Sequence, residues 1–190
     1  NADATAARRE RVLSGAPLRV LMVGSFSYRK GILDLKAIAG RLGTRFVFRF
    51  VGDVPAEGRA LKEQLGGVVE FKERVPPQKL ADEYAWGDVF LFPTIEDGFP
   101  AVLSQALASG LPVITTPHGS GPDLVRENIT GWCVPARDAE AMIARLEWLN
   151  ANRAAAVTAG EAAAASASER TWGDVAEDFV QAAKQRLITR

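Results

Sequence analysis

Short apolar runs alternate with longer amphipathic stretches along most of the chain. An apolar run bounded by turn residues is typical of a strand buried on both faces of a parallel sheet. The expected strands are Leu18–Val23, Phe46–Gly52, Val68–Phe71, Val89–Phe92, Leu111–Thr115 and Gly131–Val134. Their alternation with helices predicts right-handed βαβ units. The expected fold class is therefore α/β, a Rossmann-like doubly wound parallel sheet of about six strands with helices on both faces.

Amphipathic spacing predicts the helices between these strands. The first one follows Gly31 and has an apolar face formed by Ile32, Leu35, Ile38 and Ala39. Further helices are expected after Asp138, which would cap the segment that follows it, and over Ala56–Leu65, Gln78–Trp86, Pro100–Gly110 and Ala154–Ser168. The segment Asp3–Val12 is predicted to be either a short helix or a linker.

The last stretch of the chain also has helical spacing. Thr171 is expected to cap a helix whose apolar stripe consists of Trp172, Val175, Ala176, Phe179, Val180 and Ala183. We expect this stripe to pack on the sheet of the same domain.

Two neighbouring carboxylates stand between a buried strand and a helix in the centre of the chain. Glu96 and Asp97 follow the strand Val89–Phe92 and precede the helix Pro100–Gly110. This place is the carboxyl edge of the predicted sheet, where ligands bind. The acids either cap the helix and complement its positive end, or they contact a ligand. In the second case an anionic group would face the amides of Gly98, Phe99, Ala101 and Val102.

Two cations, Arg29 and Lys30, precede the helix that follows the first strand. A cation at the N-terminal end of a helix is unfavourable by about 0.3–1 kcal/mol. Either Asp34 neutralises the two charges, or water solvates them, or an anionic ligand lies between them and the helix end.

Composition removes several classes of function. The 190 residues hold 23 basic and 23 acidic side chains, so no excess charge indicates a nucleic acid or an anionic membrane as partner. The single cysteine, Cys133, excludes a disulfide framework and is expected to be a small buried hydrophobe. The single histidine, His118, is expected to be a surface or hydrogen-bonding residue rather than a general base. The sequence shows no P-loop, metal-binding motif, signal peptide or membrane-spanning run.

The run D-G-F-P-A-V-L-S-Q-A-L-A-S-G-L-P-V-I, which begins at Asp97, resembles the signature of the group 1 glycosyltransferases (glycosyltransferase family 4, with the two-domain GT-B fold). That signature has a Glu in E-G-F-G/P, a second Glu eight residues later and a run of small residues. Aligning the small residues puts the first Glu on Asp97 and the second on Gln105, so both positions depart from the pattern. The resemblance implies that Asp97 binds hydroxyls of a donor sugar and that Gln105 holds the ribose. Glu96 is the rival for the first role.

The same resemblance implies a diphosphate clamp after the first strand. The family has V-G-R and, several residues later, K-G, and this Arg and Lys hold the diphosphate of the donor. Lys30 matches the Lys, whereas Ser25 stands at the Arg position, and Arg29 is expected to substitute. Lys30, Arg29 and Asp97 are thus the expected catalytic residues. The expected contacts to the donor sugar and diphosphate come from Gly24, Ser25, Glu96, Gly98, Phe99, Pro100, Ala101 and Val102.

The loop after the third strand is expected to bind the base. In the family, an F-x-G-x-V loop lays its backbone along the nucleobase. Arg74 and Val75 take this role here, and Glu73 occupies the usual Gly position.

Over Leu18–Leu187 the resemblance implies the C-terminal half of a two-domain enzyme. In the family the terminal region crosses toward the other domain, so the resemblance implies that part of the last helix is left unsupported in this chain. Residues 18–190 are expected to form the donor-binding domain and residues 1–17 an N-terminal extension or linker. The chain begins Asn-Ala-Asp, and we expect the acceptor-binding N-terminal domain to be absent from it.

The implied activity is transfer of a sugar from a nucleoside-diphosphate sugar to a glycan, lipid or other acceptor, with retention of configuration and with no metal or cofactor. The isolated domain is expected to be inactive in transfer. The expected location is the cytoplasm or the inner membrane surface, with no nucleic-acid partner and with acceptor and membrane contacts reached through the absent half. Two alternatives stay open: a non-catalytic nucleotide-sugar-binding module, and one half of a nucleotide-sugar epimerase.

Overall fold

One parallel sheet forms the centre of the fold. The computed structural model describes residues 2–168 and 172–188. Its strands there are β1 (Leu18–Val23), β2 (Phe46–Val51), β3 (Val69–Lys72), β4 (Val89–Phe92), β5 (Val113–Thr115) and β6 (Gly131–Cys133). Neighbouring strands pair in parallel in the order β3-β2-β1-β4-β5-β6. Every expected strand is present, and the predicted α/β fold class is confirmed.

The strand order reverses between β1 and β4. From β1 the sheet extends through β2 to β3 on one side, and through β4 and β5 to β6 on the other. In an open parallel sheet, the loops at the carboxyl ends of the strands diverge at such a switch point and leave a crevice for a ligand. Here those loops are residues 24–31 after β1 and residues 93–100 after β4.

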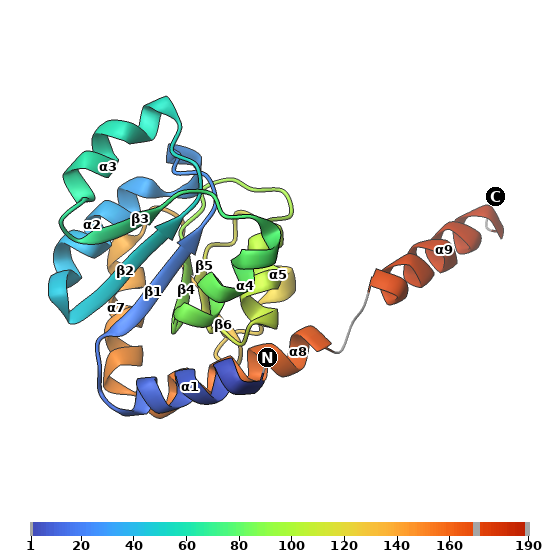
Figure 1. Ribbon diagram of the computed structural model, residues 1–190. Coiled ribbons are helices and arrows are strands. Elements are labelled where there is room, and N and C mark those ends of the chain that lie inside the picture. Colours follow the sequence, from blue (N-terminus) through green and yellow to red (C-terminus); the bar gives the residue numbers. More distant parts are fainter. Residues whose placement is uncertain (1, 169–171, 189–190) are drawn as a thin grey trace.

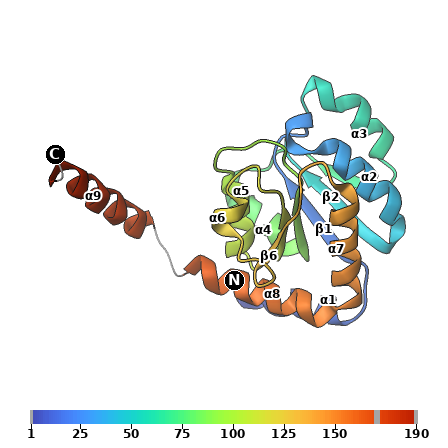
Figure 2. The ribbon, with the colours of Figure 1, turned by 180° about the vertical axis from the view of Figure 1, so that it is seen from behind.

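Helices cover both faces of the sheet (Figure 1). One face carries α2 (Ile32–Leu42), α3 (Arg59–Leu65) and α7 (Ala139–Ala151). The other carries α4 (Pro77–Trp86), α5 (Ala101–Ala108) and the short α6 (Gly121–Leu124), which is labelled in Figure 2. At the amino ends of the strands, α1 (Ala2–Leu13) and α8 (Arg153–Ser168) lie side by side (Figures 1 and 2). Short 3-10 turns cover Tyr28–Lys30, Gly43–Arg45 and Ala56–Gly58.

Two apolar clusters hold these helices on the sheet. The predicted face of α2 is buried, with Ile32, Ile38 and Ala39 completely inaccessible to water. On the opposite face, Leu103 and Leu107 of α5 belong to the second cluster. Burial of one such large aliphatic side chain stabilises the fold by about 1.5–3 kcal/mol.

Arg8 joins α1 to the amino edge of the sheet. Its buried guanidinium donates hydrogen bonds of 2.8–3.0 Å to the carbonyl oxygens of Tyr84, Gly87, Ser109 and Gly110. These carbonyls lie at the C-terminal ends of α4 and α5, where positive charge is favourable. Burial lowers the pKa of Arg8 to about 10, so the group is charged at neutral pH. The segment predicted as a helix or a linker is thus a helix packed on the domain.

The cap predicted at Asp138 is confirmed. Its carboxylate oxygen Oδ1 accepts a hydrogen bond of 2.9 Å from the amide of Ala141 in the first turn of α7. The alanine-rich α8 is helical as predicted, and its Ala156, Ala159 and Ala163 side chains are buried. Small side chains allow this helix to lie close against its neighbours.

The expected packing of the last helix is wrong. Residues Trp172–Ile188 form α9 as predicted, but this helix extends away from the sheet (Figures 1 and 2). Phe179 and Val180 are 75% and 46% exposed, and Ala176 and Ala183 are exposed as well. The reason is that other helices already cover both faces of the sheet. Thr171 and the side chains of Trp172 and Val175 lie outside the described residues.

Candidate functional site

Gly31 brings the loop after β1 against the end of β4. Its φ is 75°, and a Cβ atom there would lie 1.9 Å from the carbonyl oxygen of Pro93. Only glycine combines this backbone conformation with so close an approach. The 3-10 turn Tyr28–Lys30 therefore lies directly beside the loop that follows β4.

Backbone hydrogen bonds join the loops after β1, β4 and β5 into one layer. The amide of Ile95 donates to the carbonyl of Arg29 at 2.9 Å, and the amide of Asp97 donates to the carbonyl of His118 at 3.0 Å. These bonds fix the predicted site residues on neighbouring loops relative to one another.

Lys30 and Asp97 form a largely buried ion pair at the switch point. The Lys30 ammonium donates to Asp97 Oδ2, and the two side chains are only 10% and 18% exposed. The ammonium also lies 5.6 Å from the ring centroid of Phe92, a favourable cation–π contact. Removing one partner of such a pair leaves the other charge poorly solvated. A ligand that separates these two groups must therefore supply a charged or polar substitute for each.

Two of the interpretations left open by the sequence do not agree with the structure. Among the described residues, Asp34 forms no ion pair with Arg29 or Lys30, so neutralisation of the two cations by Asp34 is wrong. Within residues 2–168 and 172–188, no side chain caps the N-terminal end of α5, so capping by Glu96 or Asp97 is wrong as well.

The loop that follows Asp97 leaves open space before α5. Phe99 is 59% exposed, and a Cβ atom at Gly98 would have no heavy atom within 4 Å. Pro100 is buried and precedes Ala101, the first residue of α5, and Val102 is half-buried. Amides in the first turn of a helix have no partner within the helix, and here no side chain takes that place.

Gln105 is held by a tyrosine from the neighbouring helix. The Tyr84 hydroxyl donates to Gln105 Oε1 at 2.9 Å. Tyr84 is 2% exposed, and burial raises the pKa of its hydroxyl above the usual range, so the group remains a neutral donor. With one lone pair of Oε1 engaged, Gln105 offers a ligand the two donors of its amide nitrogen and the second lone pair of Oε1.

Ser25 and Gly24 contact the loop that follows β2. The Ser25 hydroxyl donates to Asp53 Oδ2 at 2.9 Å. A Cβ atom at Gly52, whose φ is 150°, would lie 1.7 Å from the carbonyl oxygen of Gly24. The two loops therefore meet in close backbone contact as well as through this hydrogen bond, and Ser25 adds no charge to the site.

The predicted base loop borders a groove of about 410 Å³ at the carboxyl ends of β2 and β3. Arg74 lines this groove together with Gly52, Asp53, Val54, Lys62, Phe71, Lys72 and Glu73. Val75 instead packs against the apolar cluster below α4 and α5. Behind the loop, the buried Glu83 accepts hydrogen bonds from Lys72 at 2.8 Å and from Arg49 at 2.9 Å, which fixes the end of β3.

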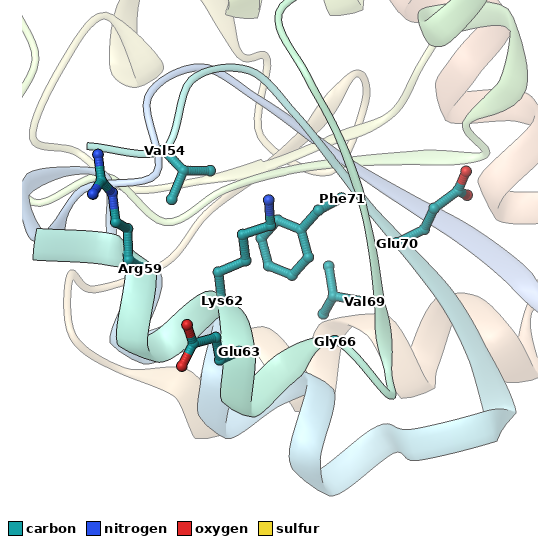
Figure 3. Close-up of a pocket in the computed structure, with 8 residues that line it drawn as sticks. All are labelled: Val54, Arg59, Lys62, Glu63, Gly66, Val69, Glu70 and Phe71. Carbon is teal, nitrogen blue, oxygen red and sulfur yellow. The ribbon is translucent and has the colours of Figure 1, made fainter. Parts of the chain in front are cut away.

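A neighbouring groove of about 710 Å³ lies between α3 and β3 at the edge of the sheet (Figure 3). We call it the α3–β3 groove. Lys62 reaches over the ring of Phe71, with 5.6 Å between the ammonium and the ring centroid. The other charged side chains that line it are Arg59, Glu63 and Glu70. Its basic and acidic groups balance, so it has no preference for an anion.

A third groove, of about 680 Å³, is lined by Arg29 but not by Lys30. It is lined by Arg29, Ile95, Glu96, His118, Ala136 and Arg137, and we call it the Arg29–Arg137 groove. Its four ionisable side chains are exposed. Arg29 and Lys30, adjacent in sequence, thus have different surroundings: one faces this groove and the other is buried with Asp97.

Tyr84 and Arg137 were not predicted as site residues. Tyr84 lies in a helix that the sequence indicates only as a connection between two strands. No neighbouring residue in the sequence indicates that its hydroxyl contacts the site. Arg137 directly precedes the cap Asp138, so it resembles ordinary loop sequence. Both reach the site only through the three-dimensional arrangement.

Cys133 is half-buried and packs against the second apolar cluster. Burial and the nearby Glu127 carboxylate raise the pKa of its thiol. Among the described residues, no three or more His, Cys, Asp or Glu side chains gather in a way that suits a metal ion. In the same part of the chain, no helix has the length and apolar character needed to cross a bilayer.

A Rossmann-like parallel sheet with charged loops at its switch point defines a class of α/β domains that bind nucleotide ligands. The model of the family "Glycosyl transferases group 1" matches residues 17–152. Because this match covers well over half of the chain, the chain belongs to that family.

Individual relatives agree with this membership. A putative colanic acid biosynthesis glycosyltransferase, WcaL, from Salmonella typhimurium is 33% identical over 145 residues, which cover 70% of this chain and 36% of the relative. The solved sucrose-phosphate synthase from Thermosynechococcus elongatus superposes with a TM-score of 0.80 at 27% identity, over 100% of this chain and 50% of that one.

A more distant likeness shows the fold alone. Anabaena HepE, solved in complex with UDP, has a TM-score of 0.76 at 19% identity and covers 97% of this chain and 52% of its own. The chain therefore spans about a third of the length of WcaL and about half of the two solved proteins.

Proposed function

We propose that this chain is the donor-binding domain of a glycosyltransferase. The whole protein would transfer a sugar from a nucleoside-diphosphate sugar to a glycan, a lipid or another acceptor, with retention of configuration and without a metal ion. The Lys30–Asp97 ion pair carries this proposal, because it places a buried cation and a carboxylate at the switch point beside the uncapped first turn of α5. Family membership supports glycosyl transfer as the reaction.

The geometry supports a division of labour on donor binding. The diphosphate replaces Asp97 as the partner of the Lys30 ammonium. The free amides at the start of α5 donate hydrogen bonds to its oxygens and so stabilise its negative charge. Asp97, released from Lys30, accepts hydrogen bonds from hydroxyls of the donor sugar. Gln105 donates to the ribose, and the groove beside Arg74 takes the base.

Catalysis in this proposal is stabilisation of a leaving group. The bond between the anomeric carbon and the diphosphate oxygen breaks, while the acceptor oxygen bonds to the same carbon and its proton leaves with the diphosphate. Lys30 and the end of α5 are fixed before reaction and stabilise the charge that develops on the departing oxygen. No side chain of this chain acts as a nucleophile.

The test is a calorimetric titration of this chain with UDP, GDP and ADP. We expect one nucleotide to bind in the micromolar to millimolar range. The substitution Lys30→Ala should weaken that binding by about tenfold or more, because a charge-assisted hydrogen bond to the diphosphate is lost. Lys36→Ala is the matched control, since Lys36 lies on the exposed surface of α2 and bonds only to Gln64.

Two results would count against the clamp. Equal nucleotide affinity in Lys30→Ala and in the unchanged chain would remove Lys30 from the site. An equal loss in Lys36→Ala would show a general effect of positive charge. Circular dichroism spectra of both variants must match that of the unchanged chain, because a misfolded variant would also lose nucleotide binding.

A non-catalytic binding module of the same fold is the second candidate. It is favoured by Gln105, an amide whose carbonyl oxygen already accepts a hydrogen bond from Tyr84, and by Ser25, which adds no charge. Release of free nucleotide from a donor sugar by the full-length protein separates the two functions, because a module that only binds would release none. In either case this chain alone should transfer no sugar.

A further inference from the structure

Most arginines within residues 2–168 have a partner. Arg49 pairs with Glu83 and stacks on Trp86, and Arg153 donates to the carbonyl of Ala16. The arginines of this part of the chain whose side chains make no hydrogen bond, ion pair or ring contact are Arg29, Arg59, Arg74 and Arg137. Each of these lines one of the grooves described above.

The Arg29–Arg137 groove gathers two of these four guanidinium groups. Its remaining ionisable side chains are His118 and Glu96, so donors outnumber acids. The α3–β3 groove differs, because its Arg59 and Lys62 are matched by two carboxylates. A groove with two partnerless guanidinium groups favours an anionic ligand.

The backbone at Arg137 adds an independent observation. Its φ is 62°, in the left-handed region that a long side chain seldom adopts. Strain of this kind persists where the surrounding structure enforces it, and it concentrates at ligand sites. The surroundings here are the cap at Asp138 and the start of α7, which hold Arg137 in place. Burial raises the pKa of Asp34 on α2, and the nearby Arg137 charge opposes this rise. No ion pair joins the two described side chains.

We propose that the Arg29–Arg137 groove binds the phosphate group of a phosphorylated acceptor, a phosphate ester of a polyol or sugar. Two guanidinium groups and one imidazole offer more donors than the two oxygens of a carboxylate can accept, whereas a phosphate monoester presents three terminal oxygens. Glu96, at the same groove, is the acceptor for a hydroxyl of the polyol.

The groove is joined to the Lys30–Asp97 pair by backbone. Arg29 precedes Lys30, Glu96 precedes Asp97, and the Asp97 amide is bonded to the carbonyl of His118. A phosphate held here places the rest of the ligand next to the position that the donor sugar takes. The acceptor role thus rests on the proposed function, whereas the phosphate site itself does not.

The single histidine makes the groove observable. After removal of any affinity tag, the His118 ring gives one imidazole Hε1 signal in proton NMR, because the chain has no other histidine. Addition of glycerol 3-phosphate or inorganic phosphate should shift this signal in a saturable way, and glycerol should not. Phosphatidylcholine vesicles with phosphatidic acid, compared with vesicles without it, test whether a lipid carries the phosphate.

Arg137→Gln and Arg29→Gln should each weaken glycerol 3-phosphate binding by about tenfold. Arg59→Gln is the matched control, an equally partnerless arginine in the α3–β3 groove, and should leave binding unchanged. The proposal is overturned if no phosphate compound or phosphatidic acid vesicle shifts the signal, or if Arg59→Gln weakens binding as much as Arg137→Gln.

A final comparison separates this site from the donor site. The titration is repeated with the nucleotide that binds the chain present at saturation. An unchanged glycerol 3-phosphate affinity supports a separate acceptor site. Competition between the two ligands would assign the groove to the donor diphosphate and overturn the acceptor role. If no nucleotide binds but the His118 signal still shifts, the phosphate site stands while the donor function fails.

Discussion

At the scale of single residues, the direction of one hydrogen bond alters what the site can recognise. A carboxylate at position 105 would accept hydrogen bonds from ribose hydroxyls. Gln105, with one lone pair of its oxygen engaged by Tyr84 at 2.9 Å, adds the donors of its amide nitrogen, which a carboxylate lacks. The sequence shows the change from acid to amide, but it cannot show which end of the amide faces the ligand, because Tyr84 lies on another helix.

Tyr84→Phe should reduce the contribution of the ribose to nucleotide binding. Without the hydroxyl, Gln105 loses its fixed orientation, and we expect affinity for the nucleotide to fall by about two- to tenfold, the value of one net hydrogen bond. The informative measurement compares the nucleotide with its deoxyribose analogues. The penalty for removing a ribose hydroxyl should shrink in the variant.

Tyr28→Phe serves as the control for this substitution. Tyr28 is the other tyrosine of the chain, and its side chain is 47% exposed. An unchanged penalty in Tyr84→Phe would show that Tyr84 only packs and does not orient Gln105.

At the scale of elements, one arginine joins three helices. Arg8 of α1 binds the carbonyl ends of α4 and α5 through four hydrogen bonds. The alanine- and arginine-rich composition of residues 3–12 predicted a helix or a linker equally well. The choice between them depends on carbonyl groups more than 70 residues away in the chain, which no local pattern reveals.

Arg8→Lys should lower the free energy of unfolding by about 3 kcal/mol. Lysine keeps the charge but lacks the planar fork that reaches several carbonyls at once, so buried acceptors lose their donors. Urea unfolding measures the change. Arg9→Lys is the neighbouring control: Arg9 pairs with Glu161 at the surface, with both side chains about half exposed, and such pairs contribute about 0–1 kcal/mol. Equal effects of the two substitutions would mean that α1 is not anchored through Arg8.

At the scale of the whole molecule, the sheet could be predicted because most strands are largely apolar runs that are local in the sequence. The contacts that make the site could not. Lys30 and Asp97 are 67 positions apart, and their contact depends on the fit of Gly31 against Pro93. The spacing of the last helix was correctly read as amphipathic, but spacing cannot say which surface its apolar stripe covers.

A chain that ends at Ser168 should be as stable as the full chain. The described α9 side chains are exposed, so their removal takes little buried area from the domain. We expect the thermal midpoint, followed by circular dichroism, to change by less than about 2 °C. A chain that ends at Asn152 is the contrast, because it also loses the buried alanines of α8, and it should be strongly destabilised. A large loss on cutting at Ser168 would show that α9 packs on this domain.

The position of Arg8 also shapes the electric potential at the far end of α5. This helix has eight residues and is about 12 Å long, with Arg8 at its negative pole and Asp97 just before its positive pole. The Arg8 guanidinium compensates the negative pole, whereas the carboxylate nearest the positive pole, Asp97, is engaged by Lys30. The buried Arg8 charge, which no substrate can reach, therefore neutralises one end of the α5 dipole. The other end of this helix attracts anions beside Lys30.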